Sequence, residues 1–311
     1  MPVKDIWQRY CPFWKETKFM SKRIETKVSI TAQGTCLMRA ISYYEQDKYY
    51  KSDDYIAPLI IPQFLNFLAK YTISRTVLKK RFFKNPGLYE YIISRTKFID
   101  NVFKNLAANI EQVLIFGAGF DSRAIRFKDE LKNAKVFELD APVTQQAKIH
   151  RLKGKNIEIP GNLKFISLDF TKESLSQKLD EAGFQKHRTC LFVLEGLTYY
   201  LNQESIDSTL SLISDYSAKD SLLVFDYASA LAIRQEHIHD DPKIKEHYQF
   251  LAKAGEKPGF TLEGPIQDFL AKYNFQLIDE LDSTKLAEMY FNKEELGLIT
   301  KKFRIVKAKN V

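Results

Sequence analysis

One stretch decides the fold: Val113-Leu114-Ile115-Phe116-Gly117-Ala118-Gly119-Phe120-Asp121-Ser122-Arg123. Four large apolar residues in a row are too few for a helix and are typical of a strand buried on both faces, as in a parallel sheet. The two glycines allow a tight turn at which a ligand can approach bare backbone. Asp121 and Ser122 are good caps, so we expect a helix that runs through Arg126 to about Leu131. Strand, glycine turn and helix together open a Rossmann-like nucleotide site.

The bulk composition is that of an ordinary globular protein. The chain has 311 residues, of which 45% are hydrophobic and 28% are charged. No apolar run approaches the roughly 20 residues that span a membrane, and the first twenty residues lack the apolar segment of a secretory signal. Three scattered cysteines, Cys11, Cys36 and Cys190, favour a reducing compartment over a disulfide framework, and none has metal-type spacing. We expect a cytoplasmic protein without a metal site or a membrane partner.

The formal net charge of +8 raises the question of nucleic acid. The lysines are spread along the whole chain, and no run of Lys and Arg is dense enough to form an obvious phosphate track. We therefore expect a solvated, lysine-rich surface and no nucleic-acid partner.

The chain divides into two parts by its pattern. Residues 1 to about 110 carry helical signals and almost no strand signals, which predicts a helical cap or lid. From Glu111 strands and helices alternate, which predicts an α/β domain over 111–311 with a mostly parallel, seven-stranded sheet and helices on both faces. The expected strands are 112–116, 135–139, 163–168, 189–194, 221–225 and a last, partly antiparallel pair at 275–281 and 302–307. The expected helices are 143–153, 172–182, 203–216 and 265–273, and a non-strand insertion over about 227–263 contains one more at 243–253.

Acidic residues follow the predicted strands in phase. Asp121, Asp140, Asp169, Glu195 and Asp226 each lie at or shortly after a strand end. One such carboxylate is usually a helix cap or a turn residue. Ligands of open parallel sheets bind outside the carboxyl ends of the strands, so five carboxylates in register predict a binding edge there.

The details of this edge favour S-adenosylmethionine over a dinucleotide. Ser122 stands where the dinucleotide fingerprint has its third glycine, and Asp121 competes for the place of a pyrophosphate at a helix N-terminus. A carboxylate there suits a ligand with an ammonium, a sulfonium and no phosphate. Asp140 can accept hydrogen bonds from ribose hydroxyls, while Asp169 can bind an adenine amino group and Phe170 can cover its ring. Because an NAD enzyme would use Asp140 in the same way, an NAD-dependent oxidoreductase remains the alternative.

Several stretches resemble the leucine carboxyl methyltransferase family of class I S-adenosylmethionine-dependent methyltransferases, especially its bacterial branch of small-molecule O-methyltransferases. The resemblance covers roughly residues 29–230, and the order and spacing of the motifs make it specific. The matching stretches are Arg95-Thr96-Lys97-Phe98-Ile99-Asp100, Gly117-Ala118-Gly119-Phe120-Asp121-Ser122-Arg123, Phe137-Glu138-Leu139-Asp140-Ala141-Pro142, Leu168-Asp169-Phe170 and Glu195-Gly196-Leu197-Thr198-Tyr199-Tyr200-Leu201. The lead-in residues Thr31-Ala32 and Arg39-Ala40 also fit.

The resemblance implies a Rossmann-like class I methyltransferase fold, S-adenosyl-L-methionine as the cofactor, and a role for each matched residue. Arg95 would pair with the cofactor carboxylate, because a guanidinium binds a carboxylate in bidentate fashion. Glu195 would lie near the cofactor amino group or the zone of methyl transfer, with Tyr199 and Tyr200 lining the pocket. The remaining implied cofactor contacts are Gly117, Ala118 and Gly119 with Asp121 around the methionine part, Asp140 at the ribose, and Asp169 and Phe170 at the adenine.

The chemistry leaves the acceptor open. Transfer from a sulfonium is an in-line displacement in which positioning does most of the work. A carboxylate acceptor needs no general base, whereas a hydroxyl acceptor does. We find no convincing base, and we interpret His237, His239 and His247 as exposed loop histidines rather than metal ligands. The sequence thus predicts an O-methyltransferase for a small-molecule carboxylate or hydroxyl, with the C-terminal carboxylate of another protein as an alternative acceptor.

Overall fold

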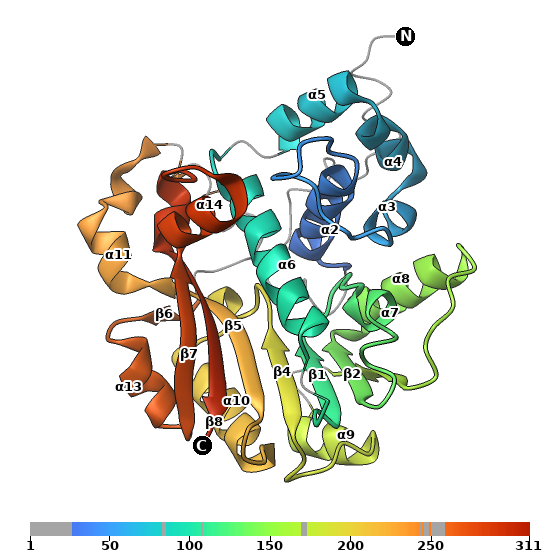
Figure 1. Cartoon of the computed structure of the whole chain (residues 1–311), viewed down its shortest axis with the longest axis vertical. Helices are drawn as coiled ribbons and strands as arrows, with labels where there is room; N and C mark the ends of the chain where they lie inside the picture. Colours follow the sequence, from blue (N-terminus) through green and yellow to red (C-terminus); the bar gives the residue numbers. More distant parts are fainter. Residues whose placement is uncertain are drawn as a thin grey trace.

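The computed structural model describes residues 27–82, 85–106, 108–168, 173–242, 244–245, 249 and 259–311. Figure 1 shows a twisted sheet with helices packed on it and a further group of helices beyond one of its ends. That end is the carboxyl edge of the parallel strands, since the antiparallel β8 finishes at the opposite end, where the C-terminus lies.

The sheet has the strand order β3-β2-β1-β4-β5-β8-β7, and the short β6 pairs with β5 beside this path. The pairs between β1 and β5 are parallel, whereas β8 is antiparallel to both β5 and β7. This confirms the expected mostly parallel sheet of a Rossmann-like class I methyltransferase. Over the described residues the sheet has eight strands rather than the expected seven, because the short β6 pairs with the end of β5. The strands are β1 (Gln112–Phe116), β2 (Lys135–Asp140), β3 (Leu163–Ser167), β4 (Cys190–Leu194), β5 (Leu222–Ser229), β6 (Thr261–Leu262), β7 (Phe275–Asp282) and β8 (Phe303–Asn310).

The helices before the sheet are α2 (Ile30–Tyr43), α3 (Ala57–Ile60), α4 (Gln63–Lys70), α5 (Thr72–Phe82) and α6 (Leu88–Lys104). Those between and after the strands are α7 (Arg123–Arg126), α8 (Pro142–Lys153), α9 (Leu175–Glu181), α10 (Gln203–Tyr216), α11 (Ala230–Gln235), α13 (Ile266–Ala271) and α14 (Ser283–Phe291). Short 3-10 helices are η2 (Thr198–Tyr200), η3 (Ile238–Asp240) and η4 (Leu298–Lys302). None of the described helices is long and apolar enough to cross a membrane.

The side chains of β1 are buried on both faces of the sheet, as the apolar run predicts. Val113 and Ile115 join one apolar core, which also contains Phe103 of α6 and residues of α2 and α3. Leu114 and Phe116 point the other way, into a core formed with α10 and α13. The helices that precede the sheet therefore share a core with it, and the predicted boundary at residue 110 stays a prediction.

The structure corrects several predicted boundaries. The helix after the glycine turn ends at Arg126 rather than Leu131, and Phe127 already leaves helical geometry. β5 continues to Ser229 because β8 pairs with it as far as Ala228, a partnership that local sequence does not reveal. The expected non-strand insertion therefore begins later, and it contains β6, which pairs with the end of β5. Helix α14 was not predicted, and most of the helix predicted at 243–253 lies outside the described residues.

Candidate active site

The glycine turn and Asp140 lie against each other at the carboxyl edge. Gly117 and Gly119 have φ values of +57° and +52°, a conformation that favours glycine. A Cβ atom at Gly119 would lie 3.0 Å from the Cβ of Ala32, so α2 covers the turn closely. The Asp140 carboxylate accepts hydrogen bonds from the Gly119 N–H and, at 2.6 Å, from the Ala141 N–H. The predicted juxtaposition of Asp140 and the glycine turn is therefore present.

A buried network of charged side chains, which we call the rim cluster, runs along the same edge. Its ion pairs connect α2 and the residues before α3 with α6, α7 and the ends of β4 and β5. The exposed fraction of every one of these side chains is 10% or less. The members are Arg39, Asp54, Arg95, Asp100, Asp121, Arg123, Arg126, Glu195 and Asp226.

Glu195 lies in the middle of the rim cluster, directly after β4. Its carboxylate accepts from Arg95 Nε at 3.0 Å and from Arg123 Nη1 at 2.6 Å. Although burial raises the pKa of Glu195, Arg123 and Arg95 hold it below its ordinary value. Glu195 is therefore an ionised hydrogen-bond acceptor and a poor general base.

Asp226 lies inside β5 rather than after it, which corrects the predicted strand end. Its Oδ2 accepts from Arg95 Nη1 at 2.5 Å, from the Tyr199 hydroxyl at 2.7 Å and from the Tyr91 hydroxyl at 3.1 Å. Its Oδ1 accepts from the Gly196 N–H at 2.6 Å. Asp226 thus holds two phenols and one guanidinium together beside Glu195.

Asp121 does not face open space, contrary to its expected place next to a bound cation. Its exposed fraction is 7%, and it accepts from the Arg123 backbone N–H at 2.6 Å and from the Arg123 guanidinium at 2.5 Å. Although burial raises its pKa, Arg123 lowers the pKa of Asp121 to about 2. Ser122 occupies the cap position of α7 without a capping bond, because its hydroxyl donates to Asp54 at 2.8 Å instead.

Tyr199 and Tyr91 meet at the end of the rim cluster. Their hydroxyl oxygens are 3.0 Å apart, and both lie within hydrogen-bond distance of Asp226. Burial and the neighbouring Asp226 carboxylate raise the pKa of both phenols well above the ordinary value. The two phenols are therefore hydrogen-bond donors near neutral pH.

The comparison with protein families decides the relationship. The leucine carboxyl methyltransferase family model matches residues 32–214, which is more than half of the chain. The chain belongs to the leucine carboxyl methyltransferase family. It is therefore an S-adenosylmethionine-dependent methyltransferase and not the NAD-dependent oxidoreductase of the alternative hypothesis.

Individual relatives agree with this family. The chain is 29% identical over 209 residues to a Bacillus subtilis protein named "Putative S-adenosyl-L-methionine-dependent methyltransferase YktD", a match over 66% of this chain and 67% of that one. A Mycobacterium tuberculosis protein with the same description is 31% identical over 177 residues, covering 57% of this chain and only 49% of its own length. A crystal structure from Thermobifida fusca, titled as a methyltransferase, has the same fold, with a TM-score of 0.55 at 16% identity over 91% and 95% of the two chains.

The charge of the rim cluster fits the cofactor of the leucine carboxyl methyltransferase family. Five carboxylates face four guanidiniums, which leaves a formal excess of one negative charge. S-adenosylmethionine carries an ammonium, a sulfonium and one carboxylate, and therefore brings one net positive charge. The described contacts of Arg95 within the rim cluster use Nε and Nη1.

Some predicted site residues lie outside the described part of the chain. Asp169 and Phe170 are among them, as are His247 and the side chain of His239. Of the described pocket aromatics, Tyr200 is 37% exposed. The described His237 side chain, directly before η3, is exposed and lies 3.5 Å from Asp240, as expected for a loop histidine. Among the described residues no group of His, Cys, Asp and Glu side chains could hold a metal ion.

Sequence reasoning missed several members of the site. Tyr91 had no signal, because an isolated tyrosine in a helix usually belongs to the core. Asp100, Arg123 and Arg126 stood in or beside the quoted family stretches, but no role was assigned to them. Asp100 accepts from Arg126 Nη1 at 2.7 Å, from Arg126 Nη2 at 2.8 Å and from Arg123 Nε at 2.8 Å. Their spacing along the chain does not reveal this contact, which joins α6 to α7.

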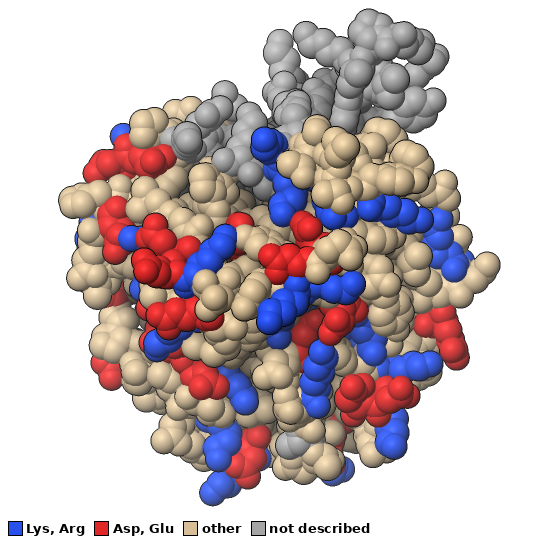
Figure 2. Space-filling view, turned by 45° about the horizontal axis from the view of Figure 1, so that its top comes forward, with Lys and Arg blue, Asp and Glu red and all other residues tan. Residues whose placement is uncertain are grey.

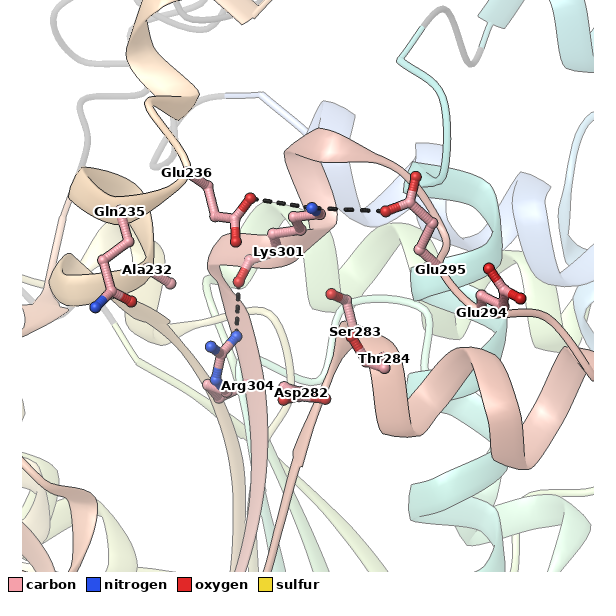
Figure 3. Close-up of a pocket in the computed structure, with 10 residues that line it drawn as sticks. All are labelled: Ala232, Gln235, Glu236, Asp282, Ser283, Thr284, Glu294, Glu295, Lys301 and Arg304. Carbon is pink, nitrogen blue, oxygen red and sulfur yellow. Dashed lines mark hydrogen bonds and ion pairs between the residues drawn. The ribbon is translucent and has the colours of Figure 1, made fainter.

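A separate hollow lies away from the rim cluster, between α11, η4 and the start of α14 (Figure 3). Its volume is about 240 Å³, and part of its charged lining is paired. Lys301 binds Glu236 at 3.0 Å and Glu295 at 3.5 Å, while Arg304 donates to the Lys301 carbonyl at 2.6 Å. The positive charge of Lys301 is therefore balanced by carboxylates of the same lining.

Proposed function

We propose that this methyltransferase acts on the carboxylate of a small molecule and forms a methyl ester. Asp140 would hold the cofactor ribose, Arg95 its carboxylate and Glu195 its amino group, with Gly117, Ala118 and Gly119 offering backbone to the methionine part. Bound S-adenosylmethionine supplies a methyl group on a sulfonium, which is already an activated leaving group. The protein's contribution is to position the two reactants and to exclude water.

The observation that carries this proposal is that the described rim offers hydrogen-bond donors but no free base. Glu195 and Asp121 are each held ionised by guanidiniums, and Asp226 accepts from four groups. The Tyr199 and Tyr91 phenols keep their protons near neutral pH. A hydroxyl acceptor would need a base within hydrogen-bond reach, whereas a carboxylate would be bound by donors such as Tyr199 and Arg95.

The family description favours the same bond, since leucine carboxyl methyltransferases are named for carboxyl chemistry. That name is also compatible with the C-terminal carboxylate of a protein as the acceptor. We favour the small molecule, in line with the bacterial branch that the motifs resemble, and we make the protein acceptor an outcome of the test.

The test follows the methyl group. The purified enzyme is incubated with S-adenosylmethionine carrying a tritiated methyl and with either the low-mass or the protein fraction of a bacterial extract. We expect label in the low-mass fraction that mild alkali releases as methanol, because esters hydrolyse and ethers do not. We also expect a rate that stays flat with pH around neutrality. Alkali-stable label would indicate a hydroxyl acceptor, and label in the protein fraction would indicate a protein acceptor. Either result would overturn the proposal.

A further inference from the structure

The hairpin of α4 and α5 exposes apolar side chains away from the rim cluster. On α4 and at its end, Phe64, Phe67 and Tyr71 are 37%, 58% and 57% exposed. On α5, Ile73 is 84% exposed and Val77 is 56% exposed. We call these five residues the hairpin face. A large exposed apolar patch on a protein surface often marks an interaction site.

The hairpin face is regular on both helices. Phe64, Phe67 and Tyr71 follow a spacing of three and four residues, which puts them on one stripe of α4, opposite the buried Leu65 and Ala69. The rings of Phe67 and Tyr71 are in contact, with centroids 5.2 Å apart. Ile73 and Val77 are one turn apart on α5, opposite the buried Arg75 and Leu78. Each helix thus has buried side chains on one side and exposed apolar side chains on the other.

The charged residues within the hairpin sequence have a single sign. Residues 55–89 contain no Asp or Glu, and they carry Lys70, Arg75, Lys79, Lys80, Arg81 and Lys84. These six cations are a large share of the net charge of +8, so the lysines are less evenly spread than the composition suggests. The stretch combines an apolar face with uniformly basic charge.

Part of this charge holds the hairpin to the protein, and part is left for a partner. Glu45 binds Arg75 at 3.3 Å and Lys79 at 2.9 Å, and Arg75 also donates to the Ala69 carbonyl at 3.1 Å, near the end of α4. Lys70 and Lys80 are exposed and flank the apolar stripes. The hairpin is therefore a fixed element with two outward cations beside its apolar face.

Acidic side chains gather elsewhere on the molecule. Figure 2 shows several of them, interspersed with Lys and Arg, over the side that carries α11 and α14, and others in the centre and on the opposite lower side. Glu236, Asp282, Glu294 and Glu295 line the hollow described above. Figure 1 shows α4 and α5 at the outer end of the molecule, beyond α2 and far from the sheet. A negatively charged surface would therefore meet the hairpin end first.

We propose that the hairpin face docks the protein on the surface of an anionic lipid bilayer. Two short helices can place Phe67, Tyr71, Ile73 and Val77 among the lipid chains near the headgroups while Lys70 and Lys80 meet anionic headgroups. The hairpin lies at the outer end of the molecule (Figure 1), where its exposed apolar side chains can reach a lipid surface. This docking is independent of the proposed methyl acceptor, and it revises the expectation of no membrane partner without requiring a spanning helix.

The test is flotation of the full-length protein with vesicles. One set is phosphatidylcholine alone, and the other contains about one third phosphatidylglycerol, in about 0.1 M salt. We expect binding to the anionic vesicles at least about ten-fold above binding to the neutral ones, and loss of this preference at high salt. The paired substitution Phe67→Ser with Ile73→Ser should weaken binding by about ten-fold or more. Lys70→Glu with Lys80→Glu should remove the preference for anionic lipid.

A matched control uses exposed apolar residues of the acidic side. Leu231 on α11 is 51% exposed and Met289 on α14 is 58% exposed, so Leu231→Ser with Met289→Ser removes similar apolar surface at a different place. This variant should bind like the wild type, and circular dichroism should show all variants folded. Three results would overturn the proposal: no preference for anionic vesicles, equal loss in the control variant, or light scattering that shows a wild-type dimer which the Phe67 and Ile73 substitutions dissociate.

Discussion

At the residue scale, Arg123 shows what the site demands of a single side chain. Its guanidinium is 2% exposed, and it contacts Asp121, Glu195 and Asp100 at 2.5 to 2.8 Å. An arginine without these partners could not be buried, since removing one partner of a buried ion pair costs about 3–5 kcal/mol. Although burial lowers it, the carboxylates raise the pKa of Arg123 well above the ordinary value. Arg123 therefore carries a permanent charge that sets the ionisation of its neighbours.

Asp140 is the residue whose loss should affect the cofactor most directly. We predict that Asp140→Ala weakens S-adenosylhomocysteine binding by about 10- to 100-fold, the equivalent of one charge-assisted hydrogen bond or somewhat more. Isothermal calorimetry measures this change. Asp129→Ala, at an exposed position beyond α7, is the control and should bind normally. Unchanged affinity in folded Asp140→Ala would remove Asp140 from the cofactor site.

At the element scale, α6 connects the glycine turn with the rest of the rim. Tyr91 and Arg95 are one turn apart on this helix and reach Asp226, while Asp100 further along binds Arg123 and Arg126. The helix packs in the same apolar core as β1. Helix α6 is thus a structural part of the site as well as one of the helices that precede the sheet.

We predict that Asp100→Asn lowers the free energy of unfolding by about 3 kcal/mol, because it leaves two buried guanidiniums short of a charge. Urea unfolding measures the change. Asp53→Asn is the matched control: its partner Lys104 is also on α6, but the side chains are 71% and 48% exposed. Such a surface pair contributes about 0.5 kcal/mol or less. Equal effects of both substitutions would contradict the importance of burial in this network.

At the scale of the whole molecule, the rim cluster links α2 and α6 to the sheet. Arg39 of α2 binds Asp54 at 2.8 Å and donates to the Phe120 carbonyl at 2.6 Å. Helix α2 is therefore bonded to the chain directly after the glycine turn. Although burial raises it, Arg126 and Arg39 lower the pKa of Asp54. Several carboxylates whose pKa values are depressed therefore stabilise the folded chain together.

We predict that this cluster makes the protein sensitive to acid. A carboxylate with a depressed pKa in the folded state stabilises it above the unfolded pKa and loses that effect as pH falls through the folded pKa. For Asp121, with a pKa of about 2, the loss is about 2 kcal/mol between about pH 4 and pH 2. Burial raises the pKa of Glu138 to about 7, so Glu138 acts in the opposite direction at higher pH. Urea unfolding across this range measures the loss, and constant stability down to pH 2 would contradict it.

The sequence by itself determined the strands, the glycine turn and the family. Apolar runs such as 112–116, and the residues that end them, are signals that lie within a few neighbouring residues. β1 is apolar along its length because its side chains point alternately to two faces that are both buried. For the same reason Asp140 was placed correctly beside the turn, since adjacent parallel strands bring their ends to one edge. The family motifs added Arg95, which no local rule would have singled out, and gave Glu195 a role.

Only the tertiary structure decided which charges meet. The sequence predicted Asp226 after a strand and Asp121 beside a bound cation. In the structure Asp226 lies inside β5 and accepts from two tyrosine hydroxyls, and Asp121 forms a buried ion pair with Arg123. The contact of Asp100 with Arg126 and the pairing of β5 with β8 join residues that are far apart in the chain. The physical reason is that strand and turn preferences arise within a few residues, whereas the partner of a buried charge is chosen by whichever elements pack around it.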